Sequence, residues 1–153
     1  MAPGDFDGNG LFECTDINLL TDAVANGSTT ADFDLDGDGV VTAADVDAWL
    51  ALAGAANLPS GNSFLHGDAN LDGFVDASDF NIWNENQFTN QTAWCLGNFN
   101  SDLVVDASDF NIWNENRFQS AAPPAVLTDV AFSHDVADED AKRTQRPAVA
   151  WML

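Results

Sequence analysis

Apolar residues recur three or four positions apart in four short segments of the chain, which is the spacing of one helix face. These residues are Ile17, Leu19, Leu20 and Val24; Val46, Trp49, Leu50 and Ala53; Phe80 and Trp83; and Phe110 and Trp113. We expect one helix in each segment, with Gly27 and Gly54 ending the first two. The last two segments contain NIWNEN, which has weak helix propensity, so these helices depend on packing. The pattern predicts an all-α fold.

The four helices belong to an internal repeat. Residues 75–86 read VDASDFNIWNEN, and residues 105–116 repeat them without a change, 30 positions later. Two looser copies, each an acidic loop followed by a helix, precede this pair. Because a unit of this size cannot bury its apolar face alone, we expect the units to pair two by two.

This pairing divides the chain into three parts. Residues 1–58 hold units one and two, and residues 59–119 hold units three and four. Residues 120–153 differ in composition and contain Pro123-Pro124, a boundary signal, so we expect a C-terminal tail there.

Each acidic loop fits the spacing of an EF-hand calcium loop, in which positions 1, 3, 5, 7, 9 and 12 supply oxygen atoms. Position 7 contributes its backbone carbonyl. The expected ligands are Asp5, Asp7, Asn9, Leu11, Glu13 and Asp16 in loop one; Asp34, Asp36, Asp38, Val40, Thr42 and Asp45 in loop two; Asp68, Asn70, Asp72, Phe74, Asp76 and Asp79 in loop three; and Asn98, Asn100, Asp102, Val104, Asp106 and Asp109 in loop four.

Loop four departs from this pattern. Glycine makes the sharp turn at position 6 of the other loops, whereas Leu103 stands there in loop four, and Asn98 removes one carboxylate. A non-glycine residue with positive φ is costly. We therefore expect three probable Ca²⁺ sites and a fourth that is weak or empty. Position 8 is apolar in all four loops, which suits short β contacts between paired loops.

The charge of the chain agrees with cation binding. It has 25 Asp and Glu residues against 4 Lys and Arg, a net charge of −21, and 21 of the acids are Asp, a common ligand of hard cations. Fifteen of the acids are expected ligands, so folding should be coupled to ion binding. Nucleic acid is not expected as a partner because no basic face can form. The longest apolar stretch, residues 48–56, is too short to span a membrane.

The loop-then-single-helix unit, with Asp at the last ligand position, resembles type I dockerin repeats. Residues 67–88, GDANLDGFVDASDFNIWNENQF, are similar to dockerin-like C-terminal modules of secreted planctomycete proteins. The resemblance covers about residues 4–119. It implies calcium-dependent folding, an extracellular location with the export signal upstream of this chain, and attachment to a cohesin-like partner. It also implies a link to enzymes that degrade polysaccharides. Dockerins usually have two such units, whereas this chain has four.

The remaining candidate residues leave alternatives open. Cys14 and Cys95 either form a disulfide, which would bring unit one beside unit four, or remain free thiols. His66 and His134 have no nucleophile at a suggestive spacing, so we expect no enzyme. The first functional hypothesis is a calcium-stabilised protein–protein interaction module. The alternative is a structural or calcium-storing matrix element without a specific partner.

Overall fold

The computed structural model describes residues 2–122, and the part of the predicted tail beyond Ala122 lies outside this range. The elements in chain order are α1 (Cys14–Ala25), the 3₁₀ turn η1 (Ala31–Phe33), α2 (Ala43–Asn57), α3 (Ala77–Asn86), the 3₁₀ turn η2 (Trp94–Leu96) and α4 (Ala107–Asn116). The predicted all-α fold is confirmed for the described residues, where β structure is limited to two isolated bridges. None of the helices in this range is both long and apolar enough to cross a membrane.

Each α-helix begins at loop position 10, because positions 9 and 12 form a reciprocal cap. The residue at position 9 is the N-cap, and the carboxylate at position 12 accepts a hydrogen bond from the N-cap backbone. The N-caps are Glu13, Thr42, Asp76 and Asp106, and their partners are Asp16, Asp45, Asp79 and Asp109. The residues predicted as ligands at positions 9 and 12 therefore also start the helices.

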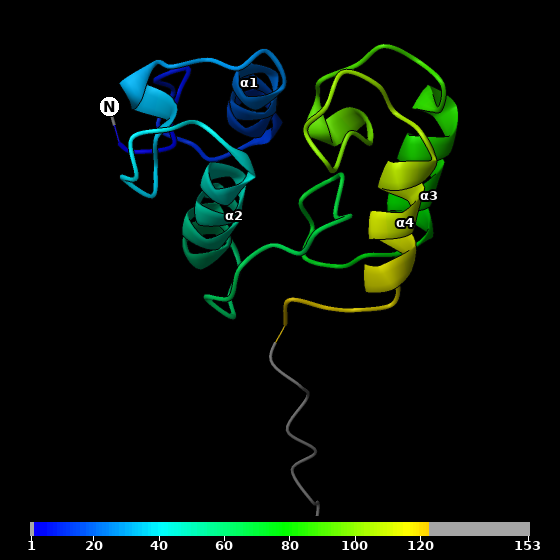
Figure 1. The fold of residues 1–153 in the computed structure, drawn as a ribbon. Coiled ribbons are helices and arrows are strands. Elements are labelled where there is room, and N and C mark those ends of the chain that lie inside the picture. The colour runs from blue at the N-terminus through cyan, green and yellow to red at the C-terminus, as the bar shows by residue number, and fades with distance from the viewer. Residues whose placement is uncertain (1, 123–153) are drawn as a thin grey trace, which may run out of the picture.

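The four helices pack as two pairs, α1 with α2 and α3 with α4, seen at the left and right of Figure 1. The turn η2 contacts both α1 and α3, and a disulfide joins Cys14 at the start of α1 to Cys95 in η2. One continuous cluster of buried apolar side chains includes residues from both pairs, among them Ile17, Trp49 and Trp83. The two pairs therefore share a core.

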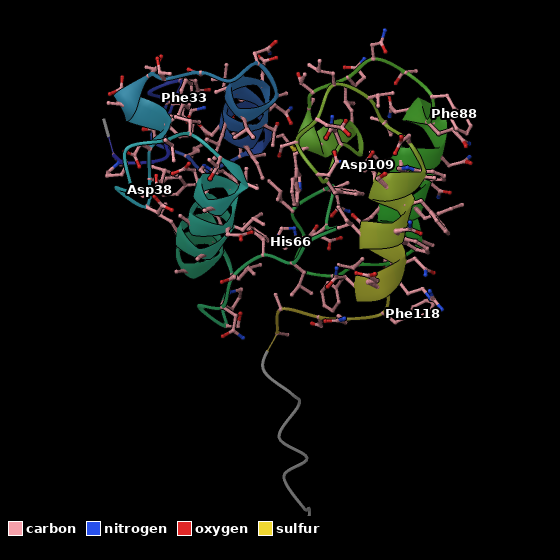
Figure 2. The ribbon with its side chains drawn as sticks, viewed as in Figure 1. Phe33, Asp38, His66, Phe88, Asp109 and Phe118 are labelled. Atoms are coloured by element: carbon pink, nitrogen blue, oxygen red, sulfur yellow. A yellow bond between two sulfur atoms is a disulfide. The ribbon has the colours of Figure 1, made fainter. Side chains whose placement is uncertain are left out.

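Trp94 lies where the two pairs meet. Its side chain is 0% exposed, and its indole N–H donates to the carbonyl oxygen of Asp68 at 2.8 Å. The ring packs edge-on against Phe99 and against His66, which lies between the halves in Figure 2 and pairs with Asp47 of α2 at 2.7 Å. The sequence pattern gave Trp94 no role, because it lies outside every helix period.

The α3–α4 pair is held by reciprocal contacts. The indole of Trp83 donates to the carbonyl of Asp106 at 2.9 Å, and the indole of Trp113 donates to the carbonyl of Asp76 at 3.0 Å. Gly97 lies so close to the facing helix that a Cβ atom there would come within 2.8 Å of the Trp83 Cα. Each helix is therefore fastened to the loop of the other unit.

Two local expectations were wrong. Gly54 does not end α2 but lies inside it, where the absent side chain lets the backbone of Asn62 approach to 2.3 Å of a hypothetical Cβ. Leu19 is 41% exposed and lies off the core face, whereas Thr21 is buried. Gly27, with φ of +65°, does follow the end of α1 as expected.

The expected β contacts between loops were also wrong. The two bridges pair Phe74 with Ser120 and Thr89 with Val105. Position 8 of loop four thus pairs with the segment that follows α3, and loop three pairs with the segment that follows α4.

Candidate metal centre

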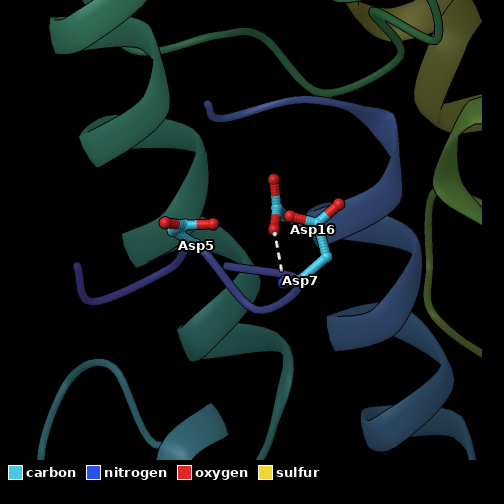
Figure 3. A group of neighbouring side chains, drawn as sticks. All are labelled: Asp5, Asp7 and Asp16. Carbon is cyan, nitrogen blue, oxygen red and sulfur yellow. Dashed lines mark hydrogen bonds between the residues drawn. The ribbon is translucent and has the colours of Figure 1, made fainter. Parts of the chain in front are cut away.

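Loop one brings three carboxylates together. Figure 3 shows Asp5, Asp7 and Asp16 as neighbouring side chains. Their oxygens lie within 4.8 Å of one another. Asp5 is 5% exposed, and one of its oxygens, Oδ2, accepts the Gly10 amide at 3.2 Å. The other, Oδ1, is the one buried side-chain nitrogen or oxygen atom in residues 2–122 that has no hydrogen-bond partner. A buried carboxylate oxygen without a partner beside two further negative charges requires a cation or a proton.

Asp16 shows how the loop shapes this cluster. Its Oδ1 accepts the backbone amides of Phe6 at 2.7 Å and of Asp7 at 3.3 Å, while its Oδ2 accepts the amide of Glu13. The corresponding bonds recur at Asp45, Asp79 and Asp109 in the other loops, and all four carboxylates are fully buried. The carboxylate at position 12 therefore holds the first residues of each loop close to the start of the helix that follows.

Loop two forms a second cluster of three carboxylates, Asp34, Asp36 and Asp38, with oxygens within 4.8 Å of one another. Asp34 accepts the backbone amides of Gly37 and Gly39 at 2.8 and 3.0 Å. The hydrogen bond from the Gly39 amide, at position 6, corresponds to the one that the Gly10 amide donates to Asp5 in loop one. Gly10 and Gly39 both have positive φ. Loops one and two therefore present carboxylates around a similarly turned backbone.

Loop three has four candidate carboxylates, as loops one and two do, but Asn70 stands in place of an aspartate at position 3 and donates to Asp72 at 2.9 Å. Asp68 is 0% exposed, and its burial, together with the charges of Asp79 and Asp72, raises its pKa to about 7. Burial also raises the pKa of Asp79. Without a cation, the loop thus holds a proton more tightly than an ordinary carboxylate does.

Loop four is held together by hydrogen bonds of the Asn98 side-chain amide. Asn98 is fully buried, and its Nδ2 donates to the carbonyl oxygens of Gln91 and Asp102, at 2.5 and 2.8 Å. Its Oδ1 accepts the Asp102 amide at 3.2 Å. The expected strain at Leu103 does not occur, because Leu103 is not among the residues with positive φ. The loop avoids the sharp glycine turn of the other three, and Asn98 supplies the closing bonds.

The structure therefore distributes the expected ligands unevenly. It brings together positions 1, 3 and 12 in loop one and positions 1, 3 and 5 in loop two. Glu13, at position 9 of loop one, accepts a hydrogen bond from Asn9 at 2.9 Å. The contribution of Gln91 to loop four was missed, since a backbone carbonyl outside the loop leaves no signal in residue spacing.

The two clusters suit a hard cation. All their side-chain donors are carboxylate oxygens, the ligands that Ca²⁺, Mg²⁺ and Mn²⁺ prefer, and the described residues offer no Cys or His beside them. Two sites able to hold a metal ion are thus present, in loops one and two.

Comparison of the chain with protein families, with curated protein sequences and with solved structures found no match.

Proposed function

We propose that this chain is a calcium-binding protein–protein interaction module of the dockerin type. The observation that carries the proposal is the unpartnered, buried Oδ1 of Asp5 within the cluster of Asp5, Asp7 and Asp16. A bound Ca²⁺ would supply the missing partner and offset the repulsion among the three carboxylates.

Calcium fits better than magnesium because the loops offer many protein oxygens. Ca²⁺ takes six to eight oxygen ligands in flexible geometry, whereas Mg²⁺ usually keeps several waters. Each loop has six candidate ligands at alternating positions, and loop three would form a third site with Asp68, Asn70 and Asp72 among its ligands. In this proposal loop four binds calcium weakly or not at all, because Asn98 already closes it.

Binding would be coupled to the direction of the helices. Asp16 is both a member of the cluster and the N-terminal cap partner of α1. An ion held there would fix the carboxylate that accepts the amides of loop one, and so hold the loop and the first turn of α1 together.

A cohesin-like extracellular protein is the proposed partner. The residues at loop positions 10 and 11, which contribute to partner choice in dockerins, are exposed as Ala43-Ala44, Ala77-Ser78 and Ala107-Ser108. In unit one, Cys14 is tied into the disulfide. The proposed contact surface therefore belongs to units two, three and four.

Calorimetric titration with Ca²⁺ tests the metal site. Asp5→Asn should weaken calcium binding at one site by at least about tenfold, since it removes a charged ligand. Glu85→Gln, which makes the same change of charge at an exposed residue of α3, should leave the titration unaltered. Equal titration curves for the wild type and Asp5→Asn would contradict calcium binding in loop one.

Binding to purified type I cohesin domains, with and without a chelator, tests the partner. Calcium-dependent binding of at least one domain is expected. If calcium binds but no cohesin does, the alternative gains support, in which the chain is a structural or calcium-storing matrix element without a specific partner.

A further inference from the structure

An apolar pocket of about 300 Å³ lies beside loop three. Its lining includes Leu58 and Pro59, just after α2, together with Asp72 and Phe74 of loop three. The Phe74 side chain is 50% exposed although its backbone is paired with Ser120. The pocket is therefore a fixed apolar surface that the described residues leave open.

The chain reaches this pocket again near the end of the described range. The Ala121 amide donates to the Gly73 carbonyl at 2.8 Å, and the Ala121 carbonyl accepts from the side chain of Asn62 at 2.7 Å. Ala122 is itself part of the pocket lining. The described range thus ends at the pocket.

The net charge of residues 1–122 is opposite in sign to that of residues 142–153. Residues 1–122 contain twenty acidic residues and one basic residue, Arg117, a net charge of −19. The segment 142–153, KRTQRPAVAWML, contains three basic residues and no acidic one. It combines positive charge with a Trp-Met-Leu sequence, so it matches an apolar pocket on a negative surface.

We propose that residues 142–153 dock on this pocket of their own chain, with Trp151 against Phe74 and Leu58 and the basic residues near Asp72. The 19 intervening residues can span up to about 65 Å, so they do not limit the return. Attachment to the same chain gives the segment an effective concentration on the order of millimolar. A second copy is the weaker candidate, because two bodies of charge −19 repel each other.

Limited trypsin digestion of the full chain tests this docking at the cleavage sites Lys142 and Arg143. Cleavage tracks the undocked fraction when docking is fast. We expect slow cleavage at low salt and about tenfold faster cleavage at about 0.5 M salt, where charges are screened beyond about 4 Å. A free peptide of residues 138–150 measures how salt affects trypsin itself.

Two substitutions should release the segment at low salt, each raising the cleavage rate about tenfold. Phe74→Ser alters the pocket, and Trp151→Ser alters the segment without touching any residue of the described fold. Phe88→Ser is the matched control for the pocket, because Phe88 is 77% exposed but lies elsewhere. Leu127→Ser, which also replaces an apolar residue after Ala122 but outside residues 142–153, is the matched control for Trp151→Ser.

Fast cleavage of the wild type at low salt, equal to that of the free peptide, would overturn the docking. Release by Leu127→Ser but not by Trp151→Ser would overturn the assignment of the occupant. Protection that increases with protein concentration would overturn the intramolecular contact in favour of one between copies.

Discussion

The α1–α2 pair and the α3–α4 pair are built from the same loop–helix unit, yet they are stabilised differently. In the first pair, aspartates stand at positions 1 and 3 of both loops, and each loop forms a carboxylate cluster. In the second pair, Asn70, Asn98 and Asn100 stand at such positions, and their amides donate hydrogen bonds within the loops. A side-chain amide can donate hydrogen bonds to other groups of the loop, whereas crowded carboxylates only accept them and repel one another unless a cation is bound.

Packing also differs between the pairs. Helices α1 and α2 bury Ile17, Leu20 and Trp49 completely, whereas the aromatic side chains of α3 and α4 are mostly only partly buried. Phe80, Trp83, Phe110 and Trp113 form a continuous aromatic cluster between α3 and α4, with ring centroids 5.1 to 6.4 Å apart. Two indole hydrogen bonds and the paired segments after the helices complete this half. The difference between the pairs therefore lies chiefly in their loops, and we expect a bound cation to stabilise the first pair more than the second.

Removal of calcium is expected to have the largest effect. An ion present at 1,000 times its dissociation constant stabilises the folded state by about 4 kcal/mol per site. Hydrogen exchange followed by mass spectrometry should show the amides of α1 and α2 exchanging much faster in chelator, with a smaller change in α3 and α4. A uniform change across all four helices would contradict the difference between the halves.

Gly97→Ala should destabilise the second pair by about 2–4 kcal/mol, whether calcium is present or not. The new Cβ would overlap the Trp83 backbone at 2.8 Å, and φ is +96°. Gly61→Ala is the matched control, with φ of +67° but open space around the added carbon, and should cost about 1 kcal/mol. Urea unfolding measures both. Equal losses would mean that the close approach of Gly97 to α3 does not stabilise the pair.

The effect of Asn98→Asp on the stability of the protein should depend on calcium, with a loss in its absence and a gain in its presence. Without the ion, it removes the two hydrogen bonds that Nδ2 donates and should lower the free energy of unfolding by about 1–3 kcal/mol. With calcium, the added carboxylate should strengthen binding in loop four. Thermal unfolding in chelator and calorimetric titration measure the two effects. A variant as stable as the wild type in chelator would show that Asn98 does not close the loop.

The pH dependence should be the smallest effect. The Asp68 pKa of about 7 lies above its ordinary value of 3.8, so its proton stabilises the metal-free folded state fully below about pH 4. This contribution is lost as the pH rises through about 7. The metal-free protein should therefore be more stable at pH 5 than at pH 8, as measured by urea unfolding. Asp68→Asn should reduce the difference in stability between pH 5 and pH 8. An unchanged difference would mean that other groups cause it.

The sequence by itself was sufficient for the local structure. Helical spacing and the acidic loops predicted all four α-helices, because a capped loop and the helix after it depend on neighbours within about twelve positions. The carboxylate clusters of loops one and two follow from the same short-range spacing. Loop four was less predictable, since its closure depends on Gln91, which lies outside the repeat spacing.

Only the tertiary structure decided how the units meet. It buries Trp94 between the helix pairs, joins Cys14 to Cys95 across 81 positions, and places Gly54 within a helix where another segment passes close to its backbone. Each of these features depends on residues far apart in the chain. Periodicity describes which face of a helix is apolar, but it does not describe what that face packs against, because that is set by the path of the chain between the helices.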